Sequence, residues 1–334
     1  MSQTQVQAPP HAQAQAHPHH HPQGPMPVQG QPGQPAQGPP PGQQQQRQPL
    51  PDCPILIWML SLNREYTHEE YDACFHLVRE CAPHIPVIYS PEDPDSFRLL
   101  MTSMLPLLMM RHRRIPRAKW RDCVTSNNKH WIEQTPDDMP PERFLHCMIG
   151  YHLAYENSLC GMAMTQGIQR KVINIGLGIK QVCTEPRNIS VAAYVESLSH
   201  KLTPIELSMM TPDLGDEVVL RRLCTVLALK QAYIKAIGQP IGFDLSRLEF
   251  NIPNQTAMGD GHPLDGWEFR IYQASLGVAR RDKLVEEKYQ CVCAFFRGSL
   301  KSNFIWHDNQ KELESWVQFI NIDQMIKVIP KLTA

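Results

Sequence analysis

The sequence predicts a mixed α+β fold, and three groups of segments carry that prediction. Residues 218–238 repeat apolar side chains at spacings of three, four or seven, which is the period of a helix. Residues 69–81 and 96–114 show further helical patterns, whereas 55–60 and 159–164 are apolar runs of strand length. We therefore expect helices packed against β-sheets.

The first 51 residues stand apart from this pattern. They are rich in glutamine, proline, glycine and histidine, and Arg47 is their only lysine, arginine, aspartate or glutamate. Such a segment buries too little apolar surface to offset the entropy of ordering it, so we expect a disordered arm. The whole chain of 334 residues and 38.2 kDa leaves room for one large or two modest domains after the arm.

Charge and cysteine usage narrow the classes of protein to consider. The formal net charge is −1, which provides no broad field for nucleic acid or an anionic membrane. No apolar run approaches the roughly 18 residues of a spanning helix, and no secretory signal begins the chain. Cys291 and Cys293 are the cysteines closest to each other in the sequence, and we expect both on one strand. Two cysteines so placed have a poor geometry for a disulfide or a zinc site. Free thiols in the cytoplasm are expected.

The first half of the chain contains the following expected elements. A strand at 55–60 leads to helices at 69–81 and 96–114, then to a strand at 122–125 and a polar turn at 126–130. Residues 142–155 fit a helix or a strand equally, and 159–164 read as a buried strand.

The second half begins with a strand at 171–182. Thr203 and Glu206 form a capping box around Pro204, which predicts the start of a helix. After the 218–238 helix, three strands are expected, with polar or charged connections between them; the strands are 247–252, 267–274 and 289–296, and the connections 254–263 and 280–288.

The 218–238 helix carries few polar residues, and they are concentrated in its C-terminal half. Lys230, Gln231 and Lys235 are the polar members, and Gly238 follows where a left-handed cap usually ends a helix. Side chains five positions apart point about 140° apart around the axis, so both lysines could border one cleft. For an arbitrary helix, the default interpretation is a core helix whose lysines extend to water.

The segment that contains these lysines resembles a signature of the larger 4′-phosphopantetheinyl transferases, the Sfp and aminoadipate-semialdehyde dehydrogenase type. The family pattern is W-x-x-K-E-[AS]-[FY]-x-K-A-x-G, followed by G-[LF]. This chain keeps Lys230, Ala232, Tyr233, Lys235, Ala236, Gly238, Gly242 and Phe243. It departs from the pattern at Leu227, in place of tryptophan, and at Gln231, in place of glutamate.

A second resemblance concerns the strand at 171–182. The family motif [VI]-G-[IV]-D-[IV] provides a magnesium-binding aspartate, and many relatives place another acid two residues later. Ile175, Gly176 and Leu177 fit the motif, but Gly178 stands at the aspartate and Lys180 at the second acid. The resemblance leaves Gln231, through its carbonyl oxygen, as a weak metal ligand.

Other positions extend the resemblance to the first half. The family's R-T-x-x-G-K-P element corresponds to residues 124–130, where Thr125 and Lys129 are retained. The family's CoA-binding histidine falls at Tyr155, with His152 three residues away on the opposite face of a strand. The resemblance covers about residues 54–330. It implies two similar α+β halves in a pseudo-twofold arrangement, divided as 52–165 and 166–334, with CoA bound between them.

The family moves phosphopantetheine from CoA to a serine of an acyl or peptidyl carrier protein and releases 3′,5′-ADP, using Mg²⁺. By this resemblance Lys230, Gln231 and Lys235 are the candidate catalytic residues, and Thr125, Lys129, Lys180 and Lys235 would bind CoA. The three acid positions hold no carboxylate here. We expect a weakened or relocated magnesium site, or a Lys180 ammonium that replaces the metal on the CoA diphosphate.

Three functions therefore remain open: a phosphopantetheinyl transferase, a non-catalytic relative that binds CoA or a carrier protein, and a structural interaction protein. The arm would be a tether in the third case. A monomer is expected, without nucleic-acid or membrane partners.

Overall fold

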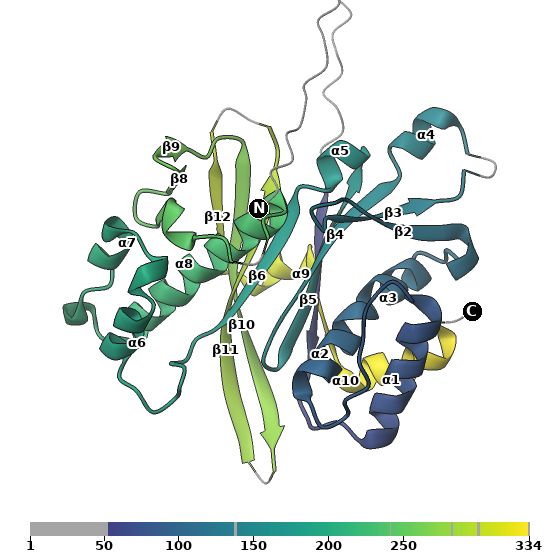
Figure 1. Cartoon of the computed structure of the whole chain (residues 1–334), viewed down its shortest axis with the longest axis horizontal. Helices are drawn as coiled ribbons and strands as arrows, with labels where there is room; N and C mark the ends of the chain where they lie inside the picture. Colours follow the sequence, from purple (N-terminus) through teal and green to yellow (C-terminus); the bar gives the residue numbers. More distant parts are fainter. Residues whose placement is uncertain (1–52, 137–138, 241, 282, 299–300, 333–334) are drawn as a thin grey trace, which may run out of the picture. The chain divides into compact units, whose positions relative to one another are not determined.

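Two main β-sheets form the framework of the described chain (Figure 1). The computed structural model describes residues 53–136, 139–240, 242–281, 283–298 and 301–332. The arm expected over residues 1–51 lies outside these residues. The chain from Pro51 to Ala334 groups as one unit by its contacts.

The first sheet has the strand order β13-β1-β5-β4-β3-β2. Its strands are β1 (Ile55–Ser61), β2 (Trp120–Val124), β3 (His130–Gln134), β4 (Met148–Glu156), β5 (Leu159–Gly167) and β13 (Val317–Asn321). Strand β13 is parallel to β1, and β5 is antiparallel to both β1 and β4. The predicted strands at 55–60 and 159–164 are confirmed. The ambiguous segment 142–155 consists of α4 (Pro141–Leu145) and most of β4.

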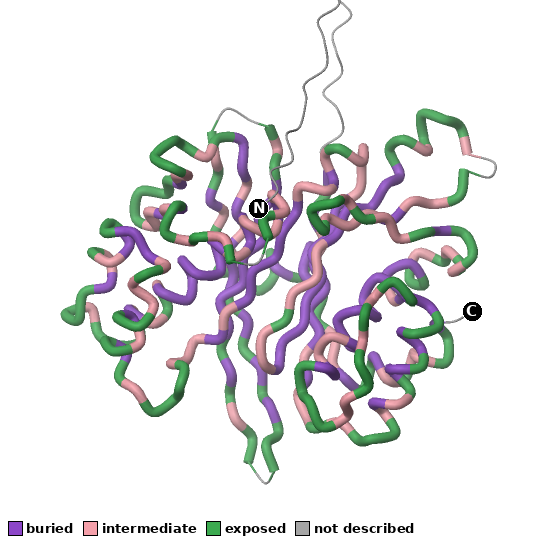
Figure 2. Tube along the Cα trace, in the orientation of Figure 1, coloured by how far each residue is buried: buried purple, intermediate pink, exposed green. Residues whose placement is uncertain are grey.

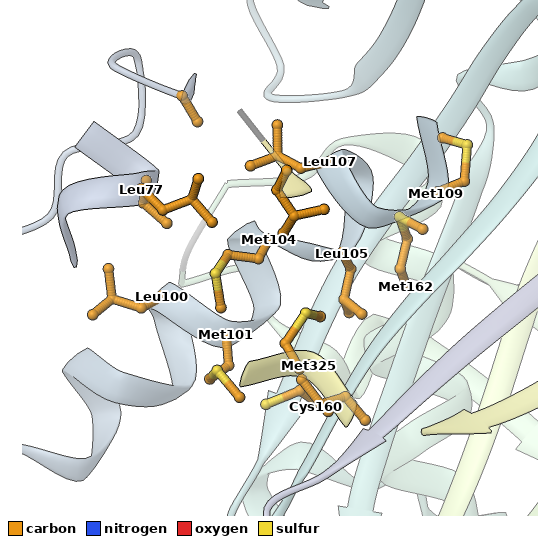
Figure 3. Packing of buried hydrophobic residues seen from close by; sticks show 14 of the residues in the cluster. Leu77, Leu100, Met101, Met104, Leu105, Leu107, Met109, Cys160, Met162 and Met325 are labelled. Carbon is orange, nitrogen blue, oxygen red and sulfur yellow. The ribbon is translucent and has the colours of Figure 1, made fainter. Parts of the chain in front are cut away.

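Helices cover one face of this sheet (Figure 1). They are α1 (His68–Cys81), α2 (Pro94–Ser103), α3 (Leu105–His112) and, from the far end of the chain, α10 (Ile322–Val328). A capping box of Thr67 and Glu70 starts α1. The helix predicted at 96–114 is two helices that meet at Met104, because Pro106 has no N–H to continue the first one. Met325 of α10 lies among methionine and leucine side chains of α2 and α3 (Figure 3).

The second sheet has the order β12-β10-β11-β6. Its strands are β6 (Ile175–Gln181), β10 (Trp267–Arg280), β11 (Lys283–Phe296) and β12 (Asn303–His307). The prediction of a connection at 280–288 was wrong, because strands β10 and β11 pair in register out to Arg280 and Lys283. Side chains from β6, β10 and β11 form an apolar core with the second face of β1 and β5.

The remaining elements lie mostly around the second sheet. They are α5 (Gln169–Val172), α6 (Val191–Ser197), α7 (Pro204–Ser208), α8 (Asp216–Ile237), α9 (Gln310–Glu314) and a small sheet of β7 (Leu248–Asn251), β8 (Thr256–Gly259) and β9 (His262–Pro263). The capping box of Thr203 and Glu206 starts α7 as predicted. Helix α8 ends at Gly238, whose φ of 75° confirms the left-handed cap. Buried residues run along α8 where it meets the sheet (Figure 2).

The strands of the two sheets follow one another along the chain in a similar order. In the first, β1 leads through helices to the β4–β5 hairpin, and β5 returns antiparallel to β1. In the second, β6 leads through helices to the β10–β11 hairpin, and β11 returns antiparallel to β6. Strands β4 and β6 lie side by side where the sheets meet. The C-terminal strand β13 joins the first sheet, so this segment crosses the boundary expected at residues 165 and 166.

Cys291 and Cys293 are free thiols, as expected, and both are buried between the two sheets. Within the residues that the structure describes, no helix combines the length and the apolar character needed to cross a membrane.

Candidate functional site

A pocket of about 710 Å³ lies along the C-terminal half of α8. Its other walls come from α6, from the 3₁₀ turn Ser199–Lys201, from residues 242–245 and from the end of β6. Three of the residues singled out in the sequence line it: Lys180, Gln231 and Lys235. The volume lies within the range of about 300–1,000 Å³ typical of small-molecule sites.

Three lysines line the pocket, Lys180, Lys201 and Lys235, and the two that the sequence singled out, Lys180 and Lys235, differ in their partners. The Lys180 ammonium contacts both carboxylate oxygens of Glu156, at 3.1 and 3.0 Å. This ion pair joins the end of β4 to β6, and its side chains are 20% and 28% exposed for Glu156 and Lys180. Lys235 forms no hydrogen bond or ion pair with any described side chain. Of these two ammonium groups, that of Lys180 is therefore paired and that of Lys235 is not.

Gln231 holds the helix to the strand. Its Oε1 accepts a hydrogen bond from the backbone N–H of Ile179, at 3.2 Å. One of the two lone pairs of the carbonyl oxygen proposed as a metal ligand is thus used within the protein.

Gly178 faces the backbone of α8. A Cβ atom at this position would lie 2.1 Å from the carbonyl oxygen of Ala228, and one at Gly176 would lie 2.1 Å from that of Ala232. Alternate residues of a strand share a face, so the two glycines together let α8 lie directly on β6. In this packing, no side chain at position 178 reaches the pocket.

The structure does not place Lys230 where a catalytic lysine was expected. Its side chain has no exposed surface, and its ammonium donates to Glu206 Oε2 at 2.6 Å. It also donates to the carbonyl oxygens of Lys201 and Leu245, at 2.7 and 3.0 Å. Because every proton of the ammonium has a partner inside the protein, Lys230 is not available to a phosphate.

Thr125 and Lys129 close the β2–β3 hairpin and do not line the pocket. Thr125 Oγ1 accepts from the Lys129 N–H at 3.1 Å, and the turn includes Asn128 with a φ of 55°. The Lys129 ammonium donates to Asn174 Oδ1 at 2.8 Å. Partial burial lowers the pKa of Lys129. A Cβ at Gly238 would touch Lys129 Cε at 2.9 Å, so this loop lies against the C-terminal end of α8.

His152 lies on β4, facing β6. Its Nδ1 accepts a hydrogen bond from the Leu177 N–H at 3.1 Å, so a neutral ring is the form that fits. Burial first, and then the charge of Lys235, lower the pKa of His152 to about 3. His152 is therefore neutral at physiological pH.

We expect His152 to make the protein sensitive to acid. The unfolded ring binds a proton near its ordinary pKa of 6.5, whereas the folded ring does so only near 3. Stability is fully present above pH 6.5 and falls as the pH decreases toward 3, by about 1.4 kcal/mol per pH unit. Urea unfolding between pH 7 and 4.5 should show this slope, and His152→Gln should flatten it. His76→Gln, on the exposed side of α1, should leave the slope unchanged; a His152→Gln variant with the wild-type slope would contradict the assignment.

The residues at the family's acid positions do not fit magnesium in this geometry. Mg²⁺ is held by one or two carboxylates together with substrate phosphates. Position 178 is covered by α8, the Gln231 oxygen is used by Ile179, and position 180 is a lysine. Among the described residues, no group of three or more histidine, cysteine, aspartate or glutamate side chains is arranged to bind a metal ion.

The sequence did not single out Glu156, Asn174 or the role of Gly176. Nothing in the sequence marks Glu156 as the partner of Lys180, because that pairing depends on β4 and β6 meeting. The alternation of Gly176 and Gly178 on a strand was a usable signal, since paired glycines of this kind allow another backbone to approach closely.

No model of a known protein family matches the chain. A curated relative does match: the 4′-phosphopantetheinyl transferase pptA of Paxillus involutus is 30% identical over 198 residues, which cover 56% of this chain and 72% of the relative. The chain belongs to the 4′-phosphopantetheinyl transferase family. Within this family, the chain brings Lys180, Gln231 and Lys235 to one pocket and buries Lys230 beneath it.

Proposed function

We propose that this chain binds coenzyme A, with the CoA diphosphate held at the α8 pocket by Lys180 and Lys235 and without the family's magnesium site. The observation that carries the proposal is that these two lysines, 55 positions apart in the sequence, converge with Gln231 on one pocket of about 710 Å³ in a phosphopantetheinyl transferase family member. The repeated order of strand, helices and returning hairpin supports a pseudo-twofold arrangement of two halves.

Charge supports this assignment. A CoA diphosphate is negatively charged, and this charge must be neutralised when the diphosphate moves from water into a protein site. The family uses a metal ion for part of that neutralisation. Here the unpaired Lys235 supplies one positive charge, and Lys180 supplies a second if it leaves Glu156. Two ammonium groups thus take the electrostatic role of the cation. Lys129, beside the end of α8, adds a third positive charge near the same helix end.

CoA binding tests the proposal directly. We expect titration calorimetry to show CoA binding in EDTA, with an affinity that Mg²⁺ changes less than twofold. Lys180→Gln and Lys235→Gln should each weaken binding about tenfold, because a charge contact at the protein surface contributes roughly 1–2 kcal/mol. Lys327→Gln, on the exposed side of α10, is the matched control and should bind normally. Absence of CoA binding by the wild-type chain would refute the proposal.

Transfer of phosphopantetheine to a serine of an acyl or peptidyl carrier protein is the second candidate, favoured by membership of the family. It requires CoA bound as above and a group that accepts the serine proton. Incubation with CoA and an apo carrier protein, followed by mass spectrometry of the carrier, distinguishes a transferase from a protein that only binds CoA. A structural interaction protein would show neither transfer nor CoA binding.

A further inference from the structure

The Lys180–Glu156 ion pair occupies the place where the two sheets meet. Lys180 belongs to β6 and lines the pocket, whereas Glu156 is the last residue of β4, before the turn to β5. The pair is mostly buried and bidentate, with 3.1 and 3.0 Å from the ammonium to the two oxygens. Through this contact a carboxylate of the first sheet lies next to Lys180, which lines the pocket; Glu156 itself is not one of the lining residues.

Glu156 has no other described hydrogen-bond partner than Lys180. While the pair is formed, the ammonium covers both of the oxygens with which the carboxylate would accept a proton. If the ammonium turns to a phosphate in the pocket, both oxygens are released and no other described side chain replaces it. An anion that attracts Lys180 would therefore free the carboxylate.

The other polar groups near the pocket lack this coupling between a phosphate and the release of a carboxylate. Glu206 is fully buried and bonded to Lys230, and Asp244 accepts hydrogen bonds from Ser246. Gln231 is neutral and cannot act as a base. Glu185 lines the pocket but contacts no described cation that a phosphate would draw away.

We propose that Glu156 is the general base for phosphopantetheine transfer in this chain, released when the CoA diphosphate takes over Lys180. This inference rests on CoA binding as proposed above. The carrier serine Oγ attacks the phosphorus that bears the pantetheine, and its proton passes to Glu156. The bond from that phosphorus to the bridging oxygen breaks, and 3′,5′-ADP leaves with the bond's electrons. Lys180 and Lys235 stabilise the charge on the phosphates.

The test measures CoA affinity and the single-turnover rate of transfer to an apo carrier protein in the same variants, with EDTA present. Glu156→Gln should lower the transfer rate about 10²–10⁴-fold, the usual contribution of a general base, while CoA affinity stays within about threefold of wild type. Glu133→Gln is a matched control, because Glu133 is also 20% exposed and ion-paired, with Arg121 on the β2–β3 hairpin. Its transfer rate should equal that of the wild type.

A small carboxylate distinguishes a base from a residue that only maintains the fold. In Glu156→Ala, added formate or acetate should restore part of the transfer rate, and it should not do so in Lys180→Gln, where the lost group is a cation. A Glu156→Gln variant that transfers at the wild-type rate would overturn the base assignment. A wild-type chain that binds CoA but transfers nothing would also overturn it. Neither result would contradict the proposed CoA site. A chain that does not bind CoA removes both proposals.

Discussion

Replacing Lys230 with methionine should destabilise the protein by about 3–5 kcal/mol, because it leaves the Glu206 carboxylate buried without its partner. Burial alone lowers the pKa of Lys230 and raises the pKa of Glu206, and the contact between them opposes both shifts. Glu206 also accepts from the backbone N–H groups of Thr203 and Phe250, at 2.9 and 2.8 Å. The pair therefore ties α7, α8 and β7 together. Urea denaturation of the two proteins measures the difference.

Two further variants separate this effect from a general loss of packing. Lys235→Met, five residues along the same helix, should change stability by less than about 0.5 kcal/mol, since Lys235 has no described ion-pair partner. Removing both charges in Lys230→Met/Glu206→Leu should recover much of the stability lost in the single variant, because no uncompensated buried charge remains. A Lys230→Met variant within about 1 kcal/mol of wild type would show that the pair does not stabilise the fold.

Local sequence signals predicted much of the fold. The capping box at Thr203 and the cap at Gly238 depend on residues within a few positions of one another, and each is present. The β10–β11 hairpin was underestimated because residues 280–288 at its end are mostly charged, although residues 274–279 of β10 alternate buried and exposed side chains. The pairing of β13 with β1 joins residues about 260 positions apart, and no local pattern indicates it.

The candidate site was predicted in part, and the reasons differ from residue to residue. The resemblance selected Lys180, Gln231 and Lys235, and the structure brings these three to one pocket. Helical periodicity gives the direction in which a side chain points, but it does not show which other segments of the chain pack over that side chain. Lys230 is buried because α7 supplies Glu206 and the segment after α8 supplies the Leu245 carbonyl.

Glu156 could not be found from the sequence for a related reason. Its role depends on the contact of β4 with β6, and the two residues of the ion pair are 24 positions apart on different sheets. The family pattern places its carboxylates at positions 178, 180 and 231, whereas the structure provides one from the neighbouring strand β4.

Restoring the family's aspartate at Gly178 should damage the fold instead of creating a metal site. The new Cβ would lie 2.1 Å from the Ala228 carbonyl oxygen and 3.0 Å from the Ala232 nitrogen, so α8 would have to move away from β6. Overpacking of this kind costs about 1–3 kcal/mol, and an unpaired carboxylate buried against backbone adds to it. We expect Gly178→Asp to lose at least about 4 kcal/mol of stability, measured by urea denaturation, or to yield no folded protein.

The same substitution at Gly277 is the control, because that glycine lies on the exposed part of β10 and its Cβ would meet only the Leu284 side chain, at 3.4 Å or more. Gly277→Asp should change stability by about 1 kcal/mol or less. Adding Gln231→Glu to Gly178→Asp should not rescue folding. A carboxylate at position 231 can accept the same hydrogen bond from the Ile179 N–H, but it does not relieve the clash with the Ala228 carbonyl oxygen. A Gly178→Asp protein with wild-type stability would mean that α8 and β6 can separate, and magnesium binding at this place would then have to be reconsidered.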